Sequence, residues 1–161
     1  MRKRILLGIF WAWVIPCQAR IIFVDANTPD NNDGSSWTNA YKYLQDALAD
    51  AASDPNVNEI RVAQGTYRPD ETTSDPNGTG NRIATFNLIN GVALRGGYAG
   101  VTEVDPNKRD IDLYKTILSG DLNDNDVEVN VSDLLTDPHR AENSYLVIRG
   151  YVSEAILVWC V

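Results

Sequence analysis

The residues best suited to chemistry in this 161-residue chain lie in one acidic stretch. The segment ILSGDLNDND is rich in oxygen-bearing side chains, among them those of Asp121, Asn123, Asp124 and Asp126. Carboxylate and amide oxygens are the ligands that Ca²⁺ prefers in proteins. These four residues are therefore the candidate metal site of the chain, and calcium is the candidate cofactor.

A helix–loop–helix calcium module fits the same stretch poorly. Counted from Asp121, the glycine that such a loop needs at its sixth position is replaced by Asp126. Ser132 stands where the last ligand should be a bidentate glutamate, and the flanking sequence predicts no helix on either side. Two alternatives stay open, a looser calcium site on a turn and an acidic insertion that faces solvent. The sequence favours the second.

Two arginines form the candidate ligand-binding site. Arg95 in ALRG and Arg149 in VIRG each stand one position before a glycine. Successive side chains of a strand alternate between its faces, so these two would point outward from strands whose neighbouring residues point inward. They would form a basic stripe that meets an anionic sugar chain, although an arginine on a solvated sheet face is the commoner situation.

Other residue types give weaker indications. The single histidine, His139, has no neighbouring serine, cysteine or metal-ligand pattern, so no catalytic residue is assigned. Five aromatic side chains could stack on sugar rings, although packing is their commoner role in a capping region. They are Trp37, Tyr41, Tyr43, Tyr67 and Tyr98.

These residues must be positioned by short strands and one helix. IIFVDA (21–26) predicts a strand, and residues 37–53 predict a helix with an apolar stripe of Ala40, Leu44, Ala47, Leu48 and Ala51. Ser36 or Thr38 is expected to cap its start, and Asp54-Pro55 to end it. After the helix the chain alternates short apolar runs with glycine, asparagine, aspartate and proline.

The later strands show a repeat. Four tetrads consist of two mostly apolar residues, a variable residue and a glycine, at intervals of about 24 to 31 residues: VAQG, ALRG, ILSG and VIRG. Such periods are typical of solenoids, in which the chain returns above itself once per repeat. On this interpretation the glycines lie at turns, and one interior column contains Ala63, Leu94, Leu118 and Ile148.

The first 19 residues predict a signal peptide. A basic start, RKR (2–4), precedes an apolar run over residues 5–16, and Ala19 is a small residue at the expected cleavage site. The run is too short to span a bilayer, so no transmembrane span is expected after cleavage. Lipidation of Cys17 is the alternative, but Pro16 is a poor fit to the small residue such sites prefer. The chain is therefore expected to be secreted or held at the cell surface.

The composition limits the partners. Removing residues 1–19 takes away three of the 14 basic residues and none of the 22 acidic ones, so the net charge falls from −8 to −11. Such a surface repels phosphate backbones and predicts that the chain does not bind nucleic acid. Only Cys160 remains as a thiol, so no internal disulfide is expected.

Several segments together resemble the N-terminal region of secreted bacterial right-handed parallel β-helix repeat proteins, of the pectin-lyase-like superfamily. They are IIFVDA, DGSSWTNAYKYLQDALADA, EIRVAQGTYRPD, FNLINGVALRGGYAG and YKTILSGDLND, in this order. The resemblance implies a mainly β fold, a right-handed parallel β-helix whose N-terminal coils are closed by one amphipathic capping helix. Residues 20–58 would form the first strand and the cap, and residues 59–161 the first coils. The apolar ending SEAILVWCV has no polar cap, so we interpret the solenoid as truncated at its C-terminus.

The resemblance leaves two functions open. The first hypothesis is a non-catalytic exported scaffold, adhesin-like or contacting a polysaccharide or cell-surface glycan. The alternative is the N-terminal fragment of a polysaccharide lyase or glycoside hydrolase whose active coils lie beyond residue 161. Lyases of this superfamily use calcium to neutralise the substrate carboxylate and an arginine or lysine as the base, but no catalytic motif of a pectinolytic family matches here.

Overall fold

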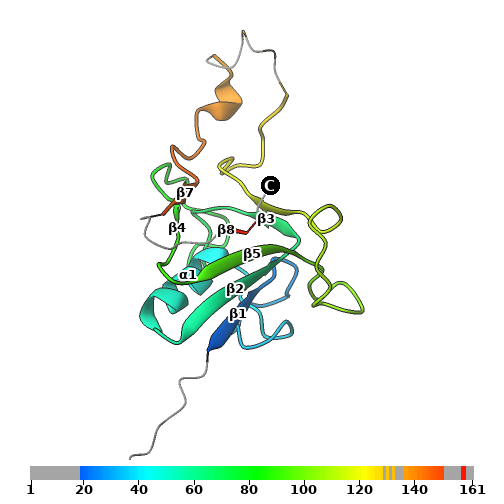
Figure 1. Cartoon of the computed structure of the whole chain (residues 1–161). Helices are drawn as coiled ribbons and strands as arrows, with labels where there is room; N and C mark the ends of the chain where they lie inside the picture. Colours follow the sequence, from blue (N-terminus) through cyan, green and yellow to red (C-terminus); the bar gives the residue numbers. More distant parts are fainter. Residues whose placement is uncertain (1–18, 129, 131, 133–135, 151–156, 159–161) are drawn as a thin grey trace, which may run out of the picture.

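The computed structural model describes residues 19–128, 130, 132, 136–150 and 157–158, so most of the predicted signal peptide lies outside the described residues. Within this part the chain is mainly β, as predicted. It has one α-helix, α1 (Leu44–Ser53), and one 3₁₀ turn, η1 (Pro138–Arg140). Figure 1 shows the strands gathered in the lower body of the molecule, with η1 on a long excursion away from it. No helix of the described residues is long and apolar enough to cross a membrane.

The largest sheet, sheet A, consists of four parallel strands in the order β1 (Arg20–Val24), β2 (Val57–Ala63), β5 (Ala93–Tyr98) and β8 (Leu157–Val158). Ile22 lies beside Ile60, and Ile60 beside Leu94, in the strand register. All three are buried in the core. Because a strand alternates its faces, the residues that follow them, Phe23, Arg61 and Arg95, point to the other side of the sheet.

Two smaller sheets repeat the same order of pairing. β3 (Gly65–Tyr67) lies parallel to β6 (Thr116–Leu118), and β4 (Phe86–Asn87) lies parallel to β7 (Ile148–Arg149). The strands β2, β3 and β4 are therefore paired, in chain order, with β5, β6 and β7. Each three-strand segment passes through sheet A and then the two smaller sheets; Figure 1 labels these strands apart from β6.

The predicted interior column is wrong. VAQG and ALRG do lie on adjacent strands of sheet A, but ILSG belongs to β6 and VIRG to β7, in two other sheets. Within sheet A, Ala63 lies beside Tyr98, and Leu94 lies beside Ile60. The pattern of apolar residues followed by glycine occurs at short strands of all three sheets, so it recurs more often than the three-strand order of pairing.

The tetrad glycines also differ in their roles. Gly65 has a φ of 144°, a backbone conformation that a side chain disfavours, and it starts β3 where the chain turns out of sheet A. Gly96 lies inside β5 instead of at a turn. A Cβ atom at Gly96 would stand 2.8 Å from Cβ of Thr116, so this glycine allows β5 and β6 to approach each other.

The helix packs its predicted stripe against the sheets. Leu44, Ala47, Leu48 and Ala51 are buried in the same core as the apolar residues of β1, β2 and β4. Its end at Asp54 is confirmed, because the Asp54 N–H donates to the carbonyl of Asp50. Its predicted start is wrong: α1 begins at Leu44, after a Tyr43 N-cap without a side-chain cap. The preceding residues instead form a turn, and Tyr41 bridges to Val24 of β1.

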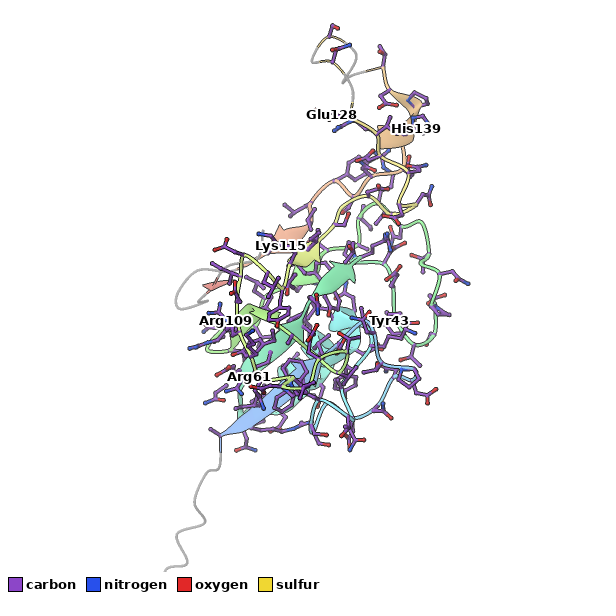
Figure 2. All side chains as sticks on the ribbon, turned by 90° about the vertical axis from the view of Figure 1, so that its right-hand side faces the viewer. Tyr43, Arg61, Arg109, Lys115, Glu128 and His139 are labelled. Atoms are coloured by element: carbon purple, nitrogen blue, oxygen red, sulfur yellow. The ribbon has the colours of Figure 1, made fainter. Side chains whose placement is uncertain are left out.

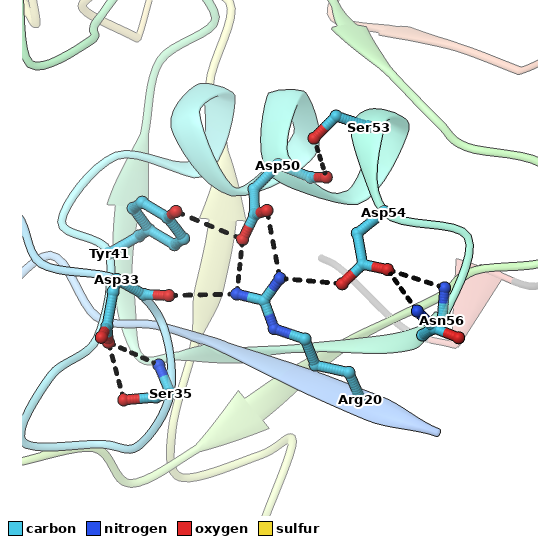
Figure 3. Close-up of polar contacts among 8 residues, drawn as sticks. All are labelled: Arg20, Asp33, Ser35, Tyr41, Asp50, Ser53, Asp54 and Asn56. Carbon is cyan, nitrogen blue, oxygen red and sulfur yellow. Dashed lines mark hydrogen bonds and ion pairs between the residues drawn. The ribbon is translucent and has the colours of Figure 1, made fainter. Parts of the chain in front are cut away.

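A polar cluster around Arg20 fastens β1 to α1 (Figure 3). The Arg20 guanidinium donates to both carboxylate oxygens of Asp50, at 3.1 and 2.7 Å, and to Asp54 at 3.2 Å. The hydroxyl of Tyr41 donates to Asp50 at 3.2 Å. The hydrogen bond to Asp50 is the main reason that the pKa of Arg20 is raised. The pKa of Asp54 is lowered first by the hydrogen bond from the Asn56 N–H and second by the hydrogen bond from Arg20. These contacts hold β1 against α1, and β1 contributes Phe23 to the outer face of sheet A.

Candidate functional site

The best-organised polar surface lies on the outer face of sheet A. Phe23, Arg61 and Arg95 are consecutive neighbours across β1, β2 and β5. Side chains from two loops complete this surface, which we call the arginine–aromatic face. Its members are Phe23, Trp37, Glu59, Arg61, Arg95, Tyr98 and Arg109.

The aromatic side chains form the base of this face. The Trp37 ring centre lies 4.9 Å from that of Phe23 in an edge-on contact, and 5.6 Å from that of Tyr98. Trp37 and Tyr98 are each only 6% exposed, and the Trp37 indole donates to Oδ1 of Asn107 at 3.0 Å. These rings are therefore mainly packed, and they support the charged groups above them.

Two arginines lie over the rings. The guanidinium carbon of Arg61 is 5.9 Å from the centre of the Phe23 ring and 5.6 Å from that of Tyr98. That of Arg109 is 5.8 Å from the centre of the Tyr98 ring, and its Nε donates to the carbonyl of Gly96 at 2.9 Å. Distances of this size are within the range of cation–π attraction. Figure 2 shows Arg61 and Arg109 on the same side of the molecule.

One carboxylate serves two of the guanidinium groups. Oε1 of Glu59 accepts from Arg61 Nε at 2.7 Å and lies 3.9 Å from Arg95 Nε. Burial opposes the charge on Arg61, but the hydrogen bond to Glu59 together with the charges of Glu59 and Tyr98 outweighs burial and raises the Arg61 pKa. The Arg95 Nε is itself buried and has no hydrogen-bond acceptor among the described residues. With three arginines and one glutamate, the face carries a surplus of positive charge in an acidic chain.

The acidic residues near Arg109 in the sequence do not cancel this charge through direct pairing. Asp105 accepts the N–H of Asn107, and Asp110 accepts the N–H groups of Asp112 and Leu113. Both carboxylates thus stabilise turns within their own loops. In the part of the chain that the structure describes, Arg109 forms no ion pair with a carboxylate.

The two predicted ligand-binding arginines are not brought together. Arg95 belongs to the arginine–aromatic face, whereas Arg149 lies on β7 beside Asn87, in another sheet, and is exposed. They do not form one stripe, and ligand binding by either stays a prediction. Arg61 and Glu59 were not predicted as site residues, although VNEIRVA alternates Ile60 and Val62 with these two charged residues.

The acidic loop has an internal structural role. Oδ1 of Asp121 accepts from the N–H groups of Asn123 and Asn125, and Oδ2 accepts from that of Asp126 at 2.9 Å. Burial opposes ionisation of Asp121, but these amides outweigh it and lower its pKa. The same carboxylate permits the positive φ of 56° at Asp124 by holding the turn closed.

The other oxygens of this loop point to separate partners. Asp124 pairs with Arg68 at 2.7 Å, and Oδ2 of Asp126 accepts from Nδ2 of Asn143 at 2.8 Å. No cluster of three or more histidine, cysteine, aspartate or glutamate side chains suited to a metal occurs among the residues with described positions. Calcium binding by this loop stays a prediction.

His139 lies far from the arginine–aromatic face (Figure 2). Its ring Nδ1 contacts Oδ1 of Asp137 at 2.9 Å.

Comparison with known proteins finds no match: no protein-family model, no curated protein and no solved structure is similar enough to assign this chain. The resemblance to parallel β-helix proteins therefore rests on the quoted segments, and the function rests on the geometry above.

Proposed function

We propose that the chain forms the first coils of an exported right-handed parallel β-helix, and that its arginine–aromatic face holds an anionic glycan at the cell surface without cleaving it. The pairing of β2, β3 and β4 with β5, β6 and β7 supports the solenoid, because each strand of one coil would lie on its counterpart in the next. The helix α1, packed on β1, β2 and β4, suits the role of an end cap.

The observation that carries the proposed glycan contact is the adjacent placement of Arg61 and Arg95. Neighbouring strands are about 4.8 Å apart, so the two guanidinium groups form a short row across the strands. A planar guanidinium can bind a carboxylate or sulfate through two parallel hydrogen bonds. The stacking of Arg61 between Phe23 and Tyr98 restricts its motion and reduces the entropy lost on binding.

A holding role agrees better with this face than hydrolysis does. Glycoside hydrolysis requires two carboxyl groups placed on either side of the scissile bond. Glu59 is the one carboxylate of the arginine–aromatic face, and Arg61 already occupies one of its oxygens at 2.7 Å. The face therefore offers positive charge and hydrogen-bond donors, which are properties of a binding surface.

The alternative is the N-terminal fragment of a polysaccharide lyase or glycoside hydrolase. The pairing of β8 with β5 adds a further strand to sheet A and fits both functions. The two functions are distinguished by turnover. A holding protein forms no ultraviolet-absorbing unsaturated product from polygalacturonate. Product that appears with the purified chain and disappears in Arg95→Ala would instead establish a lyase.

Binding tests the proposal directly. Purified protein is titrated with polygalacturonate and dextran sulfate, with neutral dextran of the same length as control. We expect binding to the anionic polymers alone, weakened about tenfold by Arg61→Ala and by adding salt. Arg149→Ala is the matched control, because that arginine is exposed in another sheet. Equal binding of neutral dextran, or an equal loss in Arg149→Ala, would contradict the proposal.

A further inference from the structure

A concave site lies away from the arginine–aromatic face. It is a pocket of about 380 Å³ between the segment that precedes α1, the strand β3 and the loop that follows β3. Figure 2 labels Tyr43, a residue of its wall, on the opposite side of the molecule from Arg61 and Arg109. We call it the Tyr43 pocket. The residues used below are Lys42, Tyr43, Thr66, Arg68, Glu71 and Asn77.

One wall of the pocket is held rigidly from behind. Arg68 donates to Oε1 of Glu71 at 3.1 Å, pairs with Asp124 at 2.7 Å and donates to the carbonyl of Asp121 at 3.0 Å. The side chains of Arg68 and Glu71 are only 15% and 20% exposed. The acidic loop therefore fixes Arg68, and Arg68 fixes the Glu71 carboxyl at the pocket.

Glu71 lines the pocket, and Arg68 donates to only one of its two carboxylate oxygens. Its Oε2 accepts no hydrogen bond from the described residues. Burial, only partly offset by Arg68, raises the pKa of Glu71. The pKa of Tyr43 is also raised, mainly by burial and to a lesser extent by the negative charges of Glu71 and Asp46. The neutral phenol and the Glu71 carboxyl therefore belong to one partly dehydrated environment.

The remaining polar groups of the wall are also unused. The Lys42 main chain is fixed, because its N–H donates to Oδ1 of Asn31 at 2.7 Å. Yet the Lys42 ammonium, the Thr66 hydroxyl and the Asn77 amide make no side-chain hydrogen bond or ion pair within the described part of the chain. Donors and acceptors of mixed charge thus surround Tyr43, and the other aromatic side chain of the lining, Tyr67, is buried.

We propose that the Tyr43 pocket binds one uncharged pyranose unit. A pyranose ring has an apolar C–H face, which suits the Tyr43 ring, and a rim of hydroxyl groups that both donate and accept hydrogen bonds. Glu71 accepts from such hydroxyls, Lys42 donates to them, and Thr66 and Asn77 do both. A simple anion would face Glu71, and a purely apolar ligand would leave these polar groups without partners. The pocket volume lies in the lower part of the range found for ligand sites.

This site differs from the proposed glycan contact in place and in chemistry. The arginine–aromatic face presents surplus positive charge to an extended anionic chain, whereas the Tyr43 pocket encloses a single ring and combines both charges. A free sugar and the terminal unit of a longer glycan share this chemistry. A methyl pyranoside and an oligosaccharide ending in the same sugar distinguish the two sources.

Saturation-transfer NMR on the purified protein tests the proposal, with the methyl pyranosides of glucose, galactose and mannose and their tetrasaccharides as probes. We expect transfer to at least one pyranoside, concentrated on the C–H protons of one ring face. Tyr43→Leu, which keeps an apolar side chain, should weaken binding about tenfold, and Glu71→Gln severalfold. Thermal melting of each variant shows whether it is folded. Arg61→Ala should leave pyranoside binding unchanged.

The outcomes separate this inference from the proposed function. Loss of anionic-polymer binding in Arg61→Ala with unchanged pyranoside binding supports both sites. No transfer to any pyranoside, or unchanged binding in folded Tyr43→Leu, overturns the pocket proposal whatever the polymers do. Glycine or alanine binding in place of the pyranosides would also overturn it, because Lys42 and Glu71 would then hold a zwitterion.

Discussion

The Arg20 cluster offers the sharpest test of how this fold is held together. Arg20→Met removes the guanidinium and keeps most of the apolar stem. Two hydrogen bonds to Asp50, at 3.1 and 2.7 Å, are lost. Among the described residues, the Asp50 carboxylate, whose side chain is 19% exposed, then keeps only its bond from Tyr41. Hydrogen bonds to charged groups contribute about 1.5–3 kcal/mol each, whereas exposed ion pairs contribute about 0–1 kcal/mol.

Arg20 is itself 34% exposed, so solvent screening places the expected loss between these limits, at about 2 kcal/mol. For a domain of this size that corresponds to a fall in Tm of about 6 °C. Urea unfolding, followed by circular dichroism, measures the free energy. A double-mutant cycle with Asp50→Asn isolates the pair, and Arg149→Met is the control for removing an exposed arginine. A change in Tm below about 1 °C, or no coupling in the cycle, would refute the reasoning.

Two further predictions concern the core and the acidic loop. Phe86→Ala should lower the free energy of unfolding by about 3–5 kcal/mol, because Phe86 is fully buried where α1 meets β4. Urea unfolding measures this free energy, and Ile83→Ala is the control because Ile83 is exposed. Asp121→Asn should remove a stabilisation that is present at neutral pH. The folded pKa of Asp121 lies below its ordinary value of 3.8. The wild type therefore loses this stabilisation as the pH falls through the folded pKa. Melting curves from pH 7 to pH 2 should therefore converge at low pH for the two proteins, and a constant difference would contradict the assignment.

Local patterns predicted the elements better than their arrangement. The apolar stripe at Leu44, Ala47, Leu48 and Ala51 gave the buried face of α1 because a helix of any length imposes that spacing. The start of the helix was wrong because Tyr41 is taken up by a bridge to Val24, a tertiary contact that cap preferences do not contain. In the same way, the glycine tetrads located short strands but could not predict which sheet each strand joins.

The candidate site shows the same contrast between local features, which the sequence predicted, and tertiary partners, which it did not. Arg95 was predicted to point outward, and it does, since the alternation of a strand is a local property. Its partners depend on register instead. Glu59 and Arg61 meet Arg95 because Ile60 lies beside Leu94, and Trp37 joins them from a loop. A sequence comparison of ALRG with VIRG could not find this set, because Arg149 occupies a similar position in a different sheet.

The acidic stretch illustrates why residue type alone does not define a metal site. Asp121, Asn123 and Asn125 place oxygen-bearing side chains at alternate positions as a calcium loop does, yet a cation requires those oxygens to converge. Here Asp121 accepts three backbone N–H groups, and Asp124 reaches Arg68. Their negative charge is directed to the loop and to a guanidinium, and through Arg68 it positions Glu71. The stretch that looks most like a ligand site is thus better understood as the support of a neighbouring pocket, whose own residues carry no sequence motif.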